Sequence, residues 1–393
     1  MKVIIAAAGT GGHINPGIAI ANKIKEEEPD SEITFIGTKR GIEKDLVPRA
    51  GYKLKTIESY GFSKKLTLDN IKKILKTLGS IRKVKKIIKE LNPDIVIGTG
   101  GYICISVCGA AKGLKVPFII HESNVLPGKA TKILSPDAEK ILVGFKEAEE
   151  KLPNAKSIVV TGTPTKGENL NYDEDTIEIK KRELGFDGKK ALVLVFGGSQ
   201  GSKSINGAIT DIIVNRLKNK TPENKEVDRK IRNNINYNSY QIIWATGPSQ
   251  YGEVKQQLDK EELNIDNLPG IKIEPYIYNM GEIMNVADLI VCRSGAMTIT
   301  ELEKIGKASI LIPFPYAAEN HQEYNARALE NEGAAKVILD KELKQGGLND
   351  MINELVSQPE KLKQMSKKSK KLSINNVEDR IYTEIKSTLN ERH

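Results

Sequence analysis

The residues between 287 and 305 have types and spacing suited to binding a nucleotide diphosphate. The apolar run 287–291 predicts a strand, the small residues 294–296 a tight turn, and the apolar spacing from Met297 onward a helix. Small residues there let a phosphate approach the backbone N–H groups at the positive end of the helix dipole. Glu301, about one turn into the helix, would then hold the two hydroxyls of a ribose. An ordinary turn followed by a solvated Glu would have the same pattern, so this segment alone leaves both interpretations open.

Three more glycine-rich loops follow predicted strands and precede predicted helices. They are Gly9-Thr-Gly-Gly-His13, Gly98-Thr-Gly-Gly-Tyr102 and Gly197-Gly-Ser-Gln-Gly201. The repeated order of strand, loop and helix predicts parallel, doubly wound sheets, because parallel neighbours need a crossover connection. The loops would then gather at the carboxyl ends of the strands, where such sheets bind ligands.

The strand pattern occurs twice along the chain, which predicts two α/β halves with a ligand cleft between them. A polar stretch, 165–187, is expected to link them, and the Asn- and Lys-rich residues 218–238 to form an inserted mobile loop. A helix is expected over 67–91, broken at Gly79-Ser80, and 361–390 is polar and mostly helical. The predicted strands are 2–8, 32–37, 54–57, 94–98, 117–121, 140–143 and 157–161, then 190–196, 241–245, 271–275, 287–291 and 308–313.

The composition favours a cytoplasmic protein without a membrane-spanning helix. No apolar run in the 393 residues reaches the roughly 20 residues that a span requires. The apolar start of the chain, within residues 1–9, is too short for the core of a signal peptide. The three cysteines, Cys104, Cys108 and Cys292, lack the spacing of metal ligands, and we expect reduced thiols at packing positions.

The positive charge is concentrated in residues 60–91, which contain ten Lys and Arg against two acidic residues, whereas the whole chain carries +9. Such a patch predicts a local anionic partner. Aromatic side chains for base stacking are nearly absent from it, which argues against nucleic acid. An anionic membrane surface is the expected partner, with Phe62 and Leu66 as apolar contacts. A helix that packs one apolar stripe inward and exposes solvated lysines would have the same pattern.

Eight short motifs occur along the chain in one order. They are Gly9-Thr-Gly-Gly-His13, Gly100-Gly-Tyr102, His121-Glu-Ser-Asn124, Thr161-Gly-Thr-Pro164, Gly197-Gly-Ser-Gln-Gly201, Cys292-Arg-Ser-Gly-Ala-Met-Thr-Ile-Thr-Glu301, Pro313-Phe314 and His321-Gln322. Together they closely resemble the MurG family, the N-acetylglucosaminyltransferases that convert lipid I to lipid II in peptidoglycan synthesis. The resemblance runs from the first strand to about Lys336.

The resemblance implies a GT-B architecture, in which two Rossmann-like, doubly wound α/β domains face each other across a cleft. Residues 1–163 would bind the acceptor and the membrane, and 164–365 would bind UDP-GlcNAc and carry the insertion at about 218–238. Residues 366–393 would form a C-terminal helix that can return to the first domain. The implied reaction moves GlcNAc from UDP-GlcNAc to the 4-hydroxyl of the N-acetylmuramoyl unit of lipid I, with inversion and without a cofactor.

The resemblance also assigns substrate contacts. Lys166 stands where the family usually has Arg; it keeps the charge but not the planar fork, so its contact with the donor is open. The implied contacts are Ile277 on uracil, Glu301 on ribose, Ser199, Ala296, Met297 and Thr298 on diphosphate, Asn124 and Gln322 on the GlcNAc hydroxyls, and Thr10, Gly11 and Gly12 closing over donor and acceptor.

His13 and Glu122 are the candidates for the base that deprotonates the acceptor hydroxyl. An imidazole suits this task at neutral pH, so His13 comes first. Each has a structural alternative: His13 could orient substrate or cap a helix, and Glu122 could be a structural carboxylate at a strand end. Helix-end N–H groups can stabilise the departing UDP, so no metal is required. Asp173-Glu-Asp175 matches the Asp-x-Asp pattern of metal-dependent glycosyltransferases, but its polar linker setting favours solvated carboxylates.

Two other classes of function remain open. One is another GT-B lipid glycosyltransferase, for example one with a diacylglycerol acceptor. The other is a UDP-GlcNAc-binding protein without transfer activity, or a UDP-GlcNAc epimerase of related fold. The His13 loop and the His121-Glu-Ser-Asn124 motif favour lipid I as the acceptor. Because lipid I is embedded in a membrane, we expect peripheral attachment to the cytoplasmic side of the cell membrane.

Overall fold

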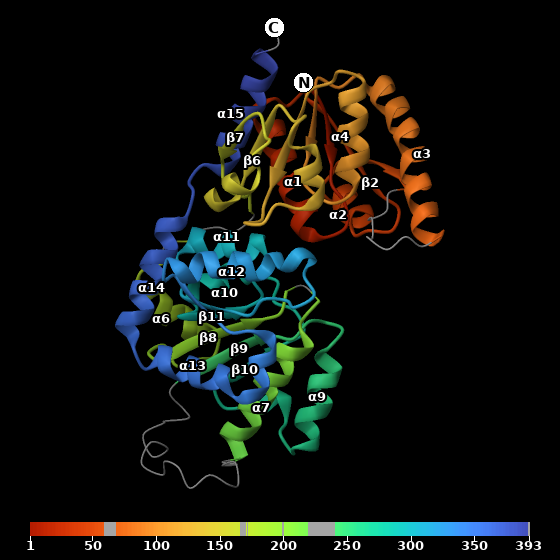
Figure 1. Cartoon of the computed structure of the whole chain (residues 1–393). Coiled ribbons are helices and arrows are strands. Elements are labelled where there is room, and N and C mark those ends of the chain that lie inside the picture. Colours follow the sequence, from red (N-terminus) through yellow and green to blue (C-terminus); the bar gives the residue numbers. More distant parts are fainter. Residues whose placement is uncertain (59–67, 166–169, 171, 199, 219–239, 392–393) are drawn as a thin grey trace. The chain divides into compact units, whose positions relative to one another are not determined.

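The computed structural model describes residues 1–58, 68–165, 170, 172–198, 200–218 and 240–391, with only the backbone described at 68–78, 218 and 344–345. The chain forms two compact units (Figure 1). Unit 1 comprises Met1–Lys166 and Ile374–His393, and unit 2 comprises Gly167–Ser373. The expected boundaries at 163/164 and 365/366 differ from these by three and eight residues. Most of the 218–238 insertion, and Phe62 and Leu66, lie outside the described residues.

Unit 1 is built on one seven-stranded parallel sheet with the order β3-β2-β1-β4-β5-β6-β7. Its carboxyl edge therefore gathers the loops after all the strands. The strands are β1 Lys2–Ala6, β2 Glu32–Thr38, β3 Lys53–Ile57, β4 Ile95–Gly98, β5 Phe118–Glu122, β6 Lys140–Val143 and β7 Ile158–Val160. Each of them overlaps a strand that the sequence predicts.

Helices cover both faces of the sheet of unit 1. Successive residues of β1 point to opposite faces, so Ile4 packs in one buried cluster and Ile5 in another. The first cluster includes Val84 and Val107 from the helices on that face, and the second includes Ile385. The helices are α1 Gly11–Glu27, α2 Glu43–Arg49, α3 Leu68–Leu91, α4 Ile103–Gly113, α5 Lys129–Leu134 and α15 Val377–Asn390, with the 3₁₀ turn η1 Lys146–Lys151.

Two helix predictions in unit 1 were wrong. Helix α1 begins at Gly11, so Gly11 to His13, expected to lie in a glycine loop, already form its first turn, and Pro16 lies inside the helix. Helix α3 continues through Gly79 without a break. A glycine inside a helix costs only about 1 kcal/mol relative to alanine, and burial of neighbours such as Val84 and Ile88 outweighs that cost.

The last helix, α15, packs against α1 in unit 1. Its apolar face buries Ile381 and Ile385 in the same cluster as α1. Polar contacts border this face: Lys23 Nζ lies 2.6 Å from a carboxylate oxygen of Asp379, and Lys386 Nζ donates to Glu28 at 2.8 Å. The end of the chain thus completes the first sheet unit.

Unit 2 contains a six-stranded parallel sheet with the order β10-β9-β8-β11-β12-β13. Trp244 on β9 is fully buried, and its Nε1–H donates to Asn206 Oδ1 at 3.2 Å. The strands are β8 Ala191–Phe196, β9 Tyr240–Ala245, β10 Ile271–Glu274, β11 Leu289–Cys292, β12 Ser309–Leu311 and β13 Ala335–Val337. Two parallel, doubly wound sheets confirm the predicted fold class.

One helix of unit 2 lies where a linker was expected. Helix α6 lies within the predicted polar linker, and Asp173 caps it by accepting from the Thr176 N–H at 2.8 Å. Asp173-Glu-Asp175 is therefore a helix start. The helices are α6 Glu174–Glu183, α7 Lys203–Lys218, α9 Tyr251–Lys260, α10 Met280–Val286, α11 Ala296–Ile305, α12 His321–Asn331, α13 Gly347–Val356 and α14 Pro359–Leu372, with 3₁₀ turns η2 Ile265–Asn267, η3 Ala318–Asn320 and η4 Asp340–Gln345.

All three cysteines are buried free thiols, as expected for packing positions. Among the helices of the described residues, none is long and apolar enough to cross a bilayer.

Candidate active site

His13 lies in the first turn of α1, at the carboxyl edge of the sheet of unit 1. Its Nδ1 lies 3.0 Å from the Ala8 carbonyl oxygen, and its own carbonyl accepts from Thr99 Oγ1 at 2.8 Å. Because a carbonyl only accepts, Nδ1 carries the proton in the neutral ring and Nε2 is the basic nitrogen. The ring packs on the backbone of Gly100, where φ is +120° and any Cβ would overlap the imidazole. The glycine turn at 98–102 therefore provides the surface against which the His13 ring packs.

Glu43 fastens the glycine loop that precedes His13. Its buried carboxylate accepts from the Gly9 N–H at 3.2 Å, and from the Thr38 N–H at 2.8 Å and Thr38 Oγ1 at 2.6 Å. Burial alone would raise the pKa of Glu43, but the hydrogen bonds from Thr38 and Gly9 outweigh it and hold the pKa below its usual value. Sequence reasoning missed this residue, because no local pattern links Glu43 to Gly9.

Glu122 lies at the end of β5 with both carboxylate oxygens occupied. One oxygen accepts from the backbone N–H and the side-chain amide of Asn124, at 3.1 and 3.0 Å. The other accepts from the Gly128 N–H at 2.9 Å and Thr131 Oγ1 at 2.6 Å. Four donors on one carboxylate favour the structural alternative for Glu122, in which it anchors the loop that carries Asn124.

His121 is buried beside this loop and is held as a neutral ring. Its Nε2 lies 2.9 Å from the Gly162 carbonyl oxygen, and its Nδ1 lies 3.4 Å from Ser123 Oγ. Burial lowers the pKa of His121, because a charged ring would be desolvated there. These contacts tie the motif at 121–124 to the one at 161–164.

In unit 2, the start of helix α11 is open to an anion. Gly295 is the N-cap residue and, as a glycine, has no side chain that could cap the helix. The N–H groups of Ala296, Met297 and Thr298 lie in the first turn, where an α-helix provides no internal acceptor. Ser294 Oγ donates to the Gln322 carbonyl at 2.8 Å, which ties this turn to helix α12. The turn therefore presents backbone donors from a fixed position.

Glu301 lies on α11, further along the same helix. Burial raises the pKa of its carboxyl to about 7, while nearby Lys304 opposes the shift. A carboxylate held in such surroundings gains from any ligand that donates hydrogen bonds to its ionised form, and the two hydroxyls of a ribose are suitable donors.

At the carboxyl edge of the sheet of unit 2, Ile277 lies in the loop after β10 and Gln322 in the first turn of α12. Gln322 Oε1 accepts from the Phe314 N–H at 3.0 Å, so the amide NH₂ is the end that can donate to a ligand. Ile277 is buried, whereas its neighbours Tyr276 and Tyr278 are exposed and stack edge to face at 5.0 Å. Backbone groups of Ile277 are therefore better placed than its side chain to meet a base.

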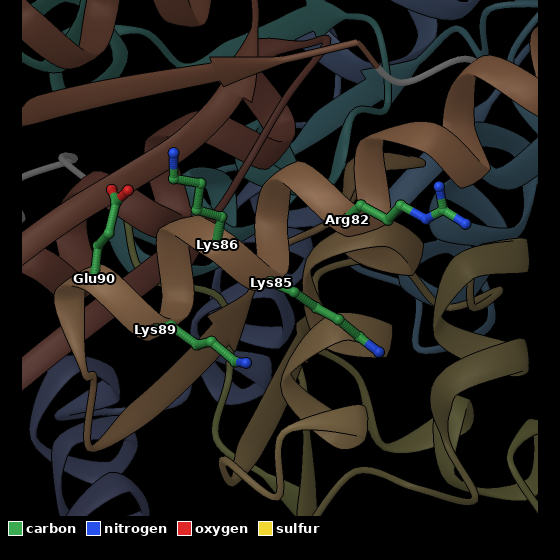
Figure 2. A pocket seen from close by; sticks show the side chains of 5 residues that line it. All are labelled: Arg82, Lys85, Lys86, Lys89 and Glu90. Atoms are coloured by element: carbon green, nitrogen blue, oxygen red, sulfur yellow. The ribbon is translucent and has the colours of Figure 1, made fainter.

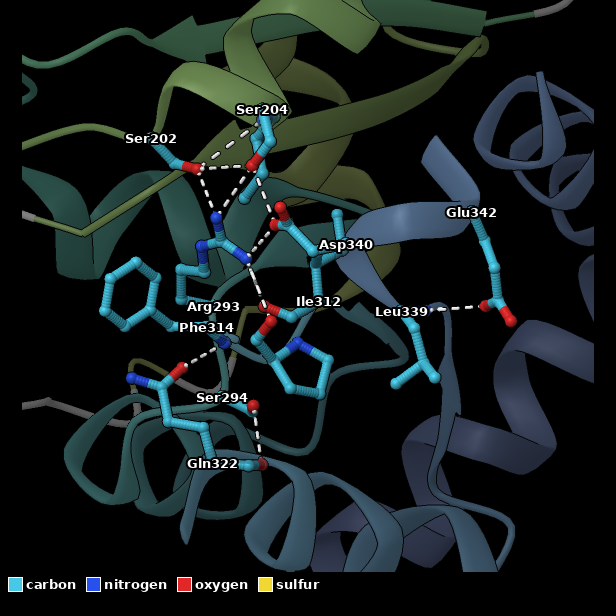
Figure 3. Close-up of polar contacts among 12 residues, drawn as sticks. Ser202, Ser204, Arg293, Ser294, Ile312, Phe314, Gln322, Leu339, Asp340 and Glu342 are labelled. Atoms are coloured by element: carbon cyan, nitrogen blue, oxygen red, sulfur yellow. Dashed lines mark hydrogen bonds and ion pairs between the residues drawn. The ribbon is translucent and has the colours of Figure 1, made fainter. Parts of the chain in front are cut away.

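Arg293, the residue before this turn, was missed by sequence reasoning (Figure 3). Its guanidinium is buried and contacts several loops that follow strands of unit 2. A charged residue directly after the buried strand β11 is the signal that could have found it, since a buried charge requires partners. The acceptors are Ile312 O at 3.1 Å, Pro313 O at 3.0 Å, Asp340 Oδ1 at 2.6 Å, Ser202 Oγ at 2.6 Å and Ser204 Oγ at 2.8 Å.

The predicted residues divide between the units. Lys166 and Ser199 lie outside the described residues. Unit 1 places Thr10, Gly11, Gly12, His13, Glu122 and Asn124 at its carboxyl edge. Unit 2 places Ile277, Ala296, Met297, Thr298, Glu301 and Gln322 on the loops and helices that follow β10, β11 and β12.

Helix α3 of unit 1 carries a basic depression on its surface (Figure 2). Arg82, Lys85, Lys86 and Lys89 line it together with Glu90. Glu90 pairs with Lys55 at 3.4 Å, so the lysines and the arginine dominate the local charge. The opposite face of this part of α3 buries Val84, Ile87 and Ile88 in the core. In the described turns, apolar residues thus pack inward and cations face outward, an arrangement that both interpretations of the patch share, and the anionic partner stays a prediction.

Comparisons with known proteins cover both units. Residues 3–143 match the glycosyltransferase family 28 N-terminal domain, and residues 192–381 match the family 28 C-terminal domain. The chain is 41% identical over 389 residues to the UDP-N-acetylglucosamine–N-acetylmuramyl-(pentapeptide) pyrophosphoryl-undecaprenol N-acetylglucosamine transferase of Acetivibrio thermocellus, covering 99% of this chain and 98% of the relative. It is 40% identical to the protein of the same name from Ruminiclostridium cellulolyticum, covering 99% and 100%.

Among solved structures, the crystal structure of Acinetobacter baumannii MurG superimposes with a TM-score of 0.73 at 25% identity, covering 98% of this chain and 100% of that one. This likeness, with two parallel α/β sheets, confirms the GT-B architecture of two Rossmann-like domains. Relatives about 40% identical over nearly the whole chain carry one name, and both family 28 domains are present. The chain therefore belongs to the family 28 glycosyltransferases and, within them, to the MurG family.

Proposed function

We propose that the protein is an inverting N-acetylglucosaminyltransferase that uses UDP-GlcNAc. It transfers GlcNAc to the 4-hydroxyl of the MurNAc unit in undecaprenyl-diphosphate-linked MurNAc-pentapeptide, lipid I, and so forms lipid II for peptidoglycan. The observation that carries this proposal is the 41% identity, over 99% of the chain, to a transferase named for this donor and acceptor.

Unit 2 is the proposed donor half. The diphosphate meets the N–H groups of Ala296, Met297 and Thr298, which the open start of α11 supports. The ribose hydroxyls donate to Glu301, and Gln322 donates its amide NH₂ to a GlcNAc hydroxyl. The same N–H groups stabilise the charge that develops on UDP as it leaves, so helix geometry supplies electrostatic stabilisation without a metal.

His13 on unit 1 is the proposed general base. The acceptor oxygen forms a bond to C1 of GlcNAc while the bond from C1 to the β-phosphate oxygen breaks. The electron pair of that bond leaves with UDP, and the acceptor proton moves to His13 Nε2. Attack from the face opposite UDP converts the α-linked donor into a β-linked product. The Nδ1 contact with Ala8 supports this role, because it fixes the tautomer and the ring orientation.

Glu122 has a different role in this proposal. Its carboxylate accepts four hydrogen bonds that hold the loop after β5, which supports an anchoring role. It positions Asn124, which forms hydrogen bonds with the GlcNAc hydroxyls.

The basic surface of α3 is the proposed contact with anionic lipid on the cytoplasmic side of the membrane. Each cation near such a surface contributes about 1 kcal/mol, or roughly fivefold in affinity. Replacing Arg82, Lys85, Lys86 and Lys89 by Gln should therefore weaken sedimentation with vesicles that contain phosphatidylglycerol by more than about a hundredfold. Equal loss from a matched control on α14 of unit 2, Lys363, Lys367, Lys368 and Lys371→Gln, would mean that only net charge matters.

A transfer assay tests the proposed reaction. The purified protein receives labelled UDP-GlcNAc and a short-chain lipid I analogue, with and without EDTA, and the product is identified by mass and anomeric configuration. A β-linked disaccharide lipid formed in EDTA is the expected result. UDP-GlcNAc binding without transfer would contradict the acceptor assignment, and diacylglycerol acceptors and epimerisation would then be assayed.

A further inference from the structure

Arg293 makes more contacts than a structural ion pair needs. The residue is 9% exposed, and its guanidinium lies within 3.1 Å of five oxygen atoms, of which only Asp340 Oδ1 is charged. Asp340 also accepts from Ser204 Oγ at 2.7 Å, so the cation and its counterion share a partner. Guanidinium presents its donors in one rigid plane, which suits several fixed acceptors.

The five acceptors come from three segments that follow different strands at one edge of the sheet. Ser202 and Ser204 follow β8, Ile312 and Pro313 follow β12, and Asp340 follows β13; Arg293 itself follows β11. Because these strands are parallel neighbours, their carboxyl ends lie side by side. One side chain thus joins the loops of four strands.

Two of these loops lead directly to groups that would touch the donor. Arg293 precedes the turn at 294–296, whose Ser294 Oγ donates to the Gln322 carbonyl. The Pro313 carbonyl that Arg293 holds is followed by Phe314, whose N–H orients the Gln322 amide, and the guanidinium lies 5.4 Å from the Phe314 ring centroid. Figure 3 shows this connection from Arg293 to Gln322.

We infer that Arg293, held by Asp340, is a positioning residue that sets the donor-binding loops of unit 2. This inference rests on the proposed donor half of the reaction. Arg293 donates hydrogen bonds to carbonyl and hydroxyl oxygens at the edge of the sheet, next to the start of α11. Without these hydrogen bonds, the same oxygens would face the diphosphate bound at the α11 N–H groups and repel it. The side chain acts through the loops it holds and does not contact the donor in this assignment.

The test is Arg293→Lys, with UDP affinity from calorimetry and separate KM values for donor and acceptor. Lysine keeps a charge for Asp340, but its single ammonium nitrogen cannot replace the two guanidinium nitrogens that contact the five acceptors. We expect the Kd for UDP and the KM for UDP-GlcNAc to rise at least about tenfold, because small loop displacements at a binding site have effects of this size. The KM for the lipid I analogue should stay within about twofold. Arg182→Lys, an exposed arginine of α6 paired with Glu178, is the matched control.

A second variant covers the case in which Arg293→Lys does not fold. The double variant Ser202→Ala, Ser204→Ala removes two acceptors but retains the pair with Asp340 and should shift the donor constants in the same direction. A folded Arg293→Lys whose UDP Kd and donor KM match those of the parent, with only a lower Tm, would overturn the inference. If the parent protein itself fails to bind UDP, the proposed function fails instead, so the two failures are distinguishable.

Discussion

The two units share a parallel, doubly wound topology, but Glu43 and Glu122 of unit 1 and Arg293 of unit 2, which hold loops at the carboxyl edges, carry opposite charge. In unit 1, the buried carboxylates of Glu43 and Glu122 collect N–H and O–H donors. In unit 2, the buried guanidinium of Arg293 collects carbonyl, carboxylate and hydroxyl oxygens. Both arrangements satisfy buried polar groups: the carboxylates of unit 1 accept hydrogen bonds, whereas the guanidinium of unit 2 donates them.

We infer from this difference that the anchors at the edge of a sheet, and not its strand order, influence which ligand the edge accepts. A carboxylate anchor forms hydrogen bonds with backbone N–H donors, which are then not available to a ligand. A guanidinium anchor forms hydrogen bonds with oxygens and leaves the N–H groups at the start of α11 available. The proposed roles of the two units agree with this difference between their anchors. Unit 2 receives the diphosphate, and unit 1 supplies the base, His13, for a neutral hydroxyl.

The largest effect should come from His13→Ala. Loss of a general base costs roughly 10²- to 10⁴-fold in turnover. UDP binding should be unchanged, because the proposed diphosphate and ribose contacts belong to unit 2. Steady-state kinetics and calorimetry on the same preparation measure both quantities. A variant that retains more than about a tenth of the parent turnover would remove His13 from the base role. A variant that also loses UDP affinity would break the proposed separation between the units.

Much of the fold could be predicted because runs of Val, Ile and Leu mark strands buried on both faces. The six residues of β8 fall within the predicted 190–196 for this reason. Strand β13, Ala335–Val337, was missed because three residues that include Lys336 carry no readable pattern. The start of α1 was misplaced because Gly12 and Pro16 are typical of turns, while burial of Ile14 and Ile18 favours the helix.

The candidate site could be predicted only where its signal is local. The glycine turns and the motif around Glu301 are contiguous, so their spacing is readable. The anchors are not, because Glu43 lies 34 positions from Gly9, and Arg293 lies 91 positions from Ser202. Such pairs exist only once the sheet has brought distant loops together. The roles of Glu122 as anchor and of the Gly100 turn as a seat for His13 are likewise tertiary features.

Glu301 should make donor binding depend on pH. Burial raises the pKa of this carboxyl to about 7, and ribose hydroxyls favour its ionised form. UDP affinity should therefore fall roughly tenfold per pH unit below 7 and level off above it. Calorimetry at pH values from about 5.5 to about 8.5 measures this dependence of UDP affinity on pH. Glu301→Gln should bind UDP weakly at every pH, and Glu253→Gln, an exposed carboxylate of unit 2 that pairs with Lys203, is the matched control.

Glu301 should also lower the free energy of unfolding at pH values where its carboxyl is ionised. A carboxyl with a raised folded-state pKa stabilises the fold at low pH and loses that contribution as pH rises from about 4.5 to about 7. Glu301→Gln should thus raise the free energy of unfolding at pH 8 by up to about 3 kcal/mol and change it little near pH 4.5. Denaturant unfolding at the two pH values measures this. A variant that is less stable than the parent at pH 8 would contradict a desolvated carboxylate.

The smallest effect should come from Glu43→Gln, which tests the carboxylate anchor of unit 1. Glutamine keeps one acceptor oxygen but turns an NH₂ group toward the N–H of Gly9 or Thr38, so at least one charge-assisted hydrogen bond is lost. The free energy of unfolding of unit 1 should fall by about 1–3 kcal/mol. Turnover should decrease as the His13 loop loosens, while UDP affinity stays unchanged. Hydrogen exchange resolved by unit measures the local effect, and Glu26→Gln, exposed and paired with Lys23, is the control.

The pH dependence gives this variant a second readout. The folded-state pKa of Glu43 is lowered, so its carboxylate stabilises unit 1 above the ordinary pKa of about 4.5, and that contribution is lost as pH falls below this value. Glu43→Gln should remove this part of the acid sensitivity of unit 1 and leave unit 2 unaffected. If unit 2 responded equally, or if UDP affinity fell with turnover, the two edges would depend on one another. The contrast between a carboxylate-anchored and a guanidinium-anchored unit would then no longer explain how the chain divides the reaction.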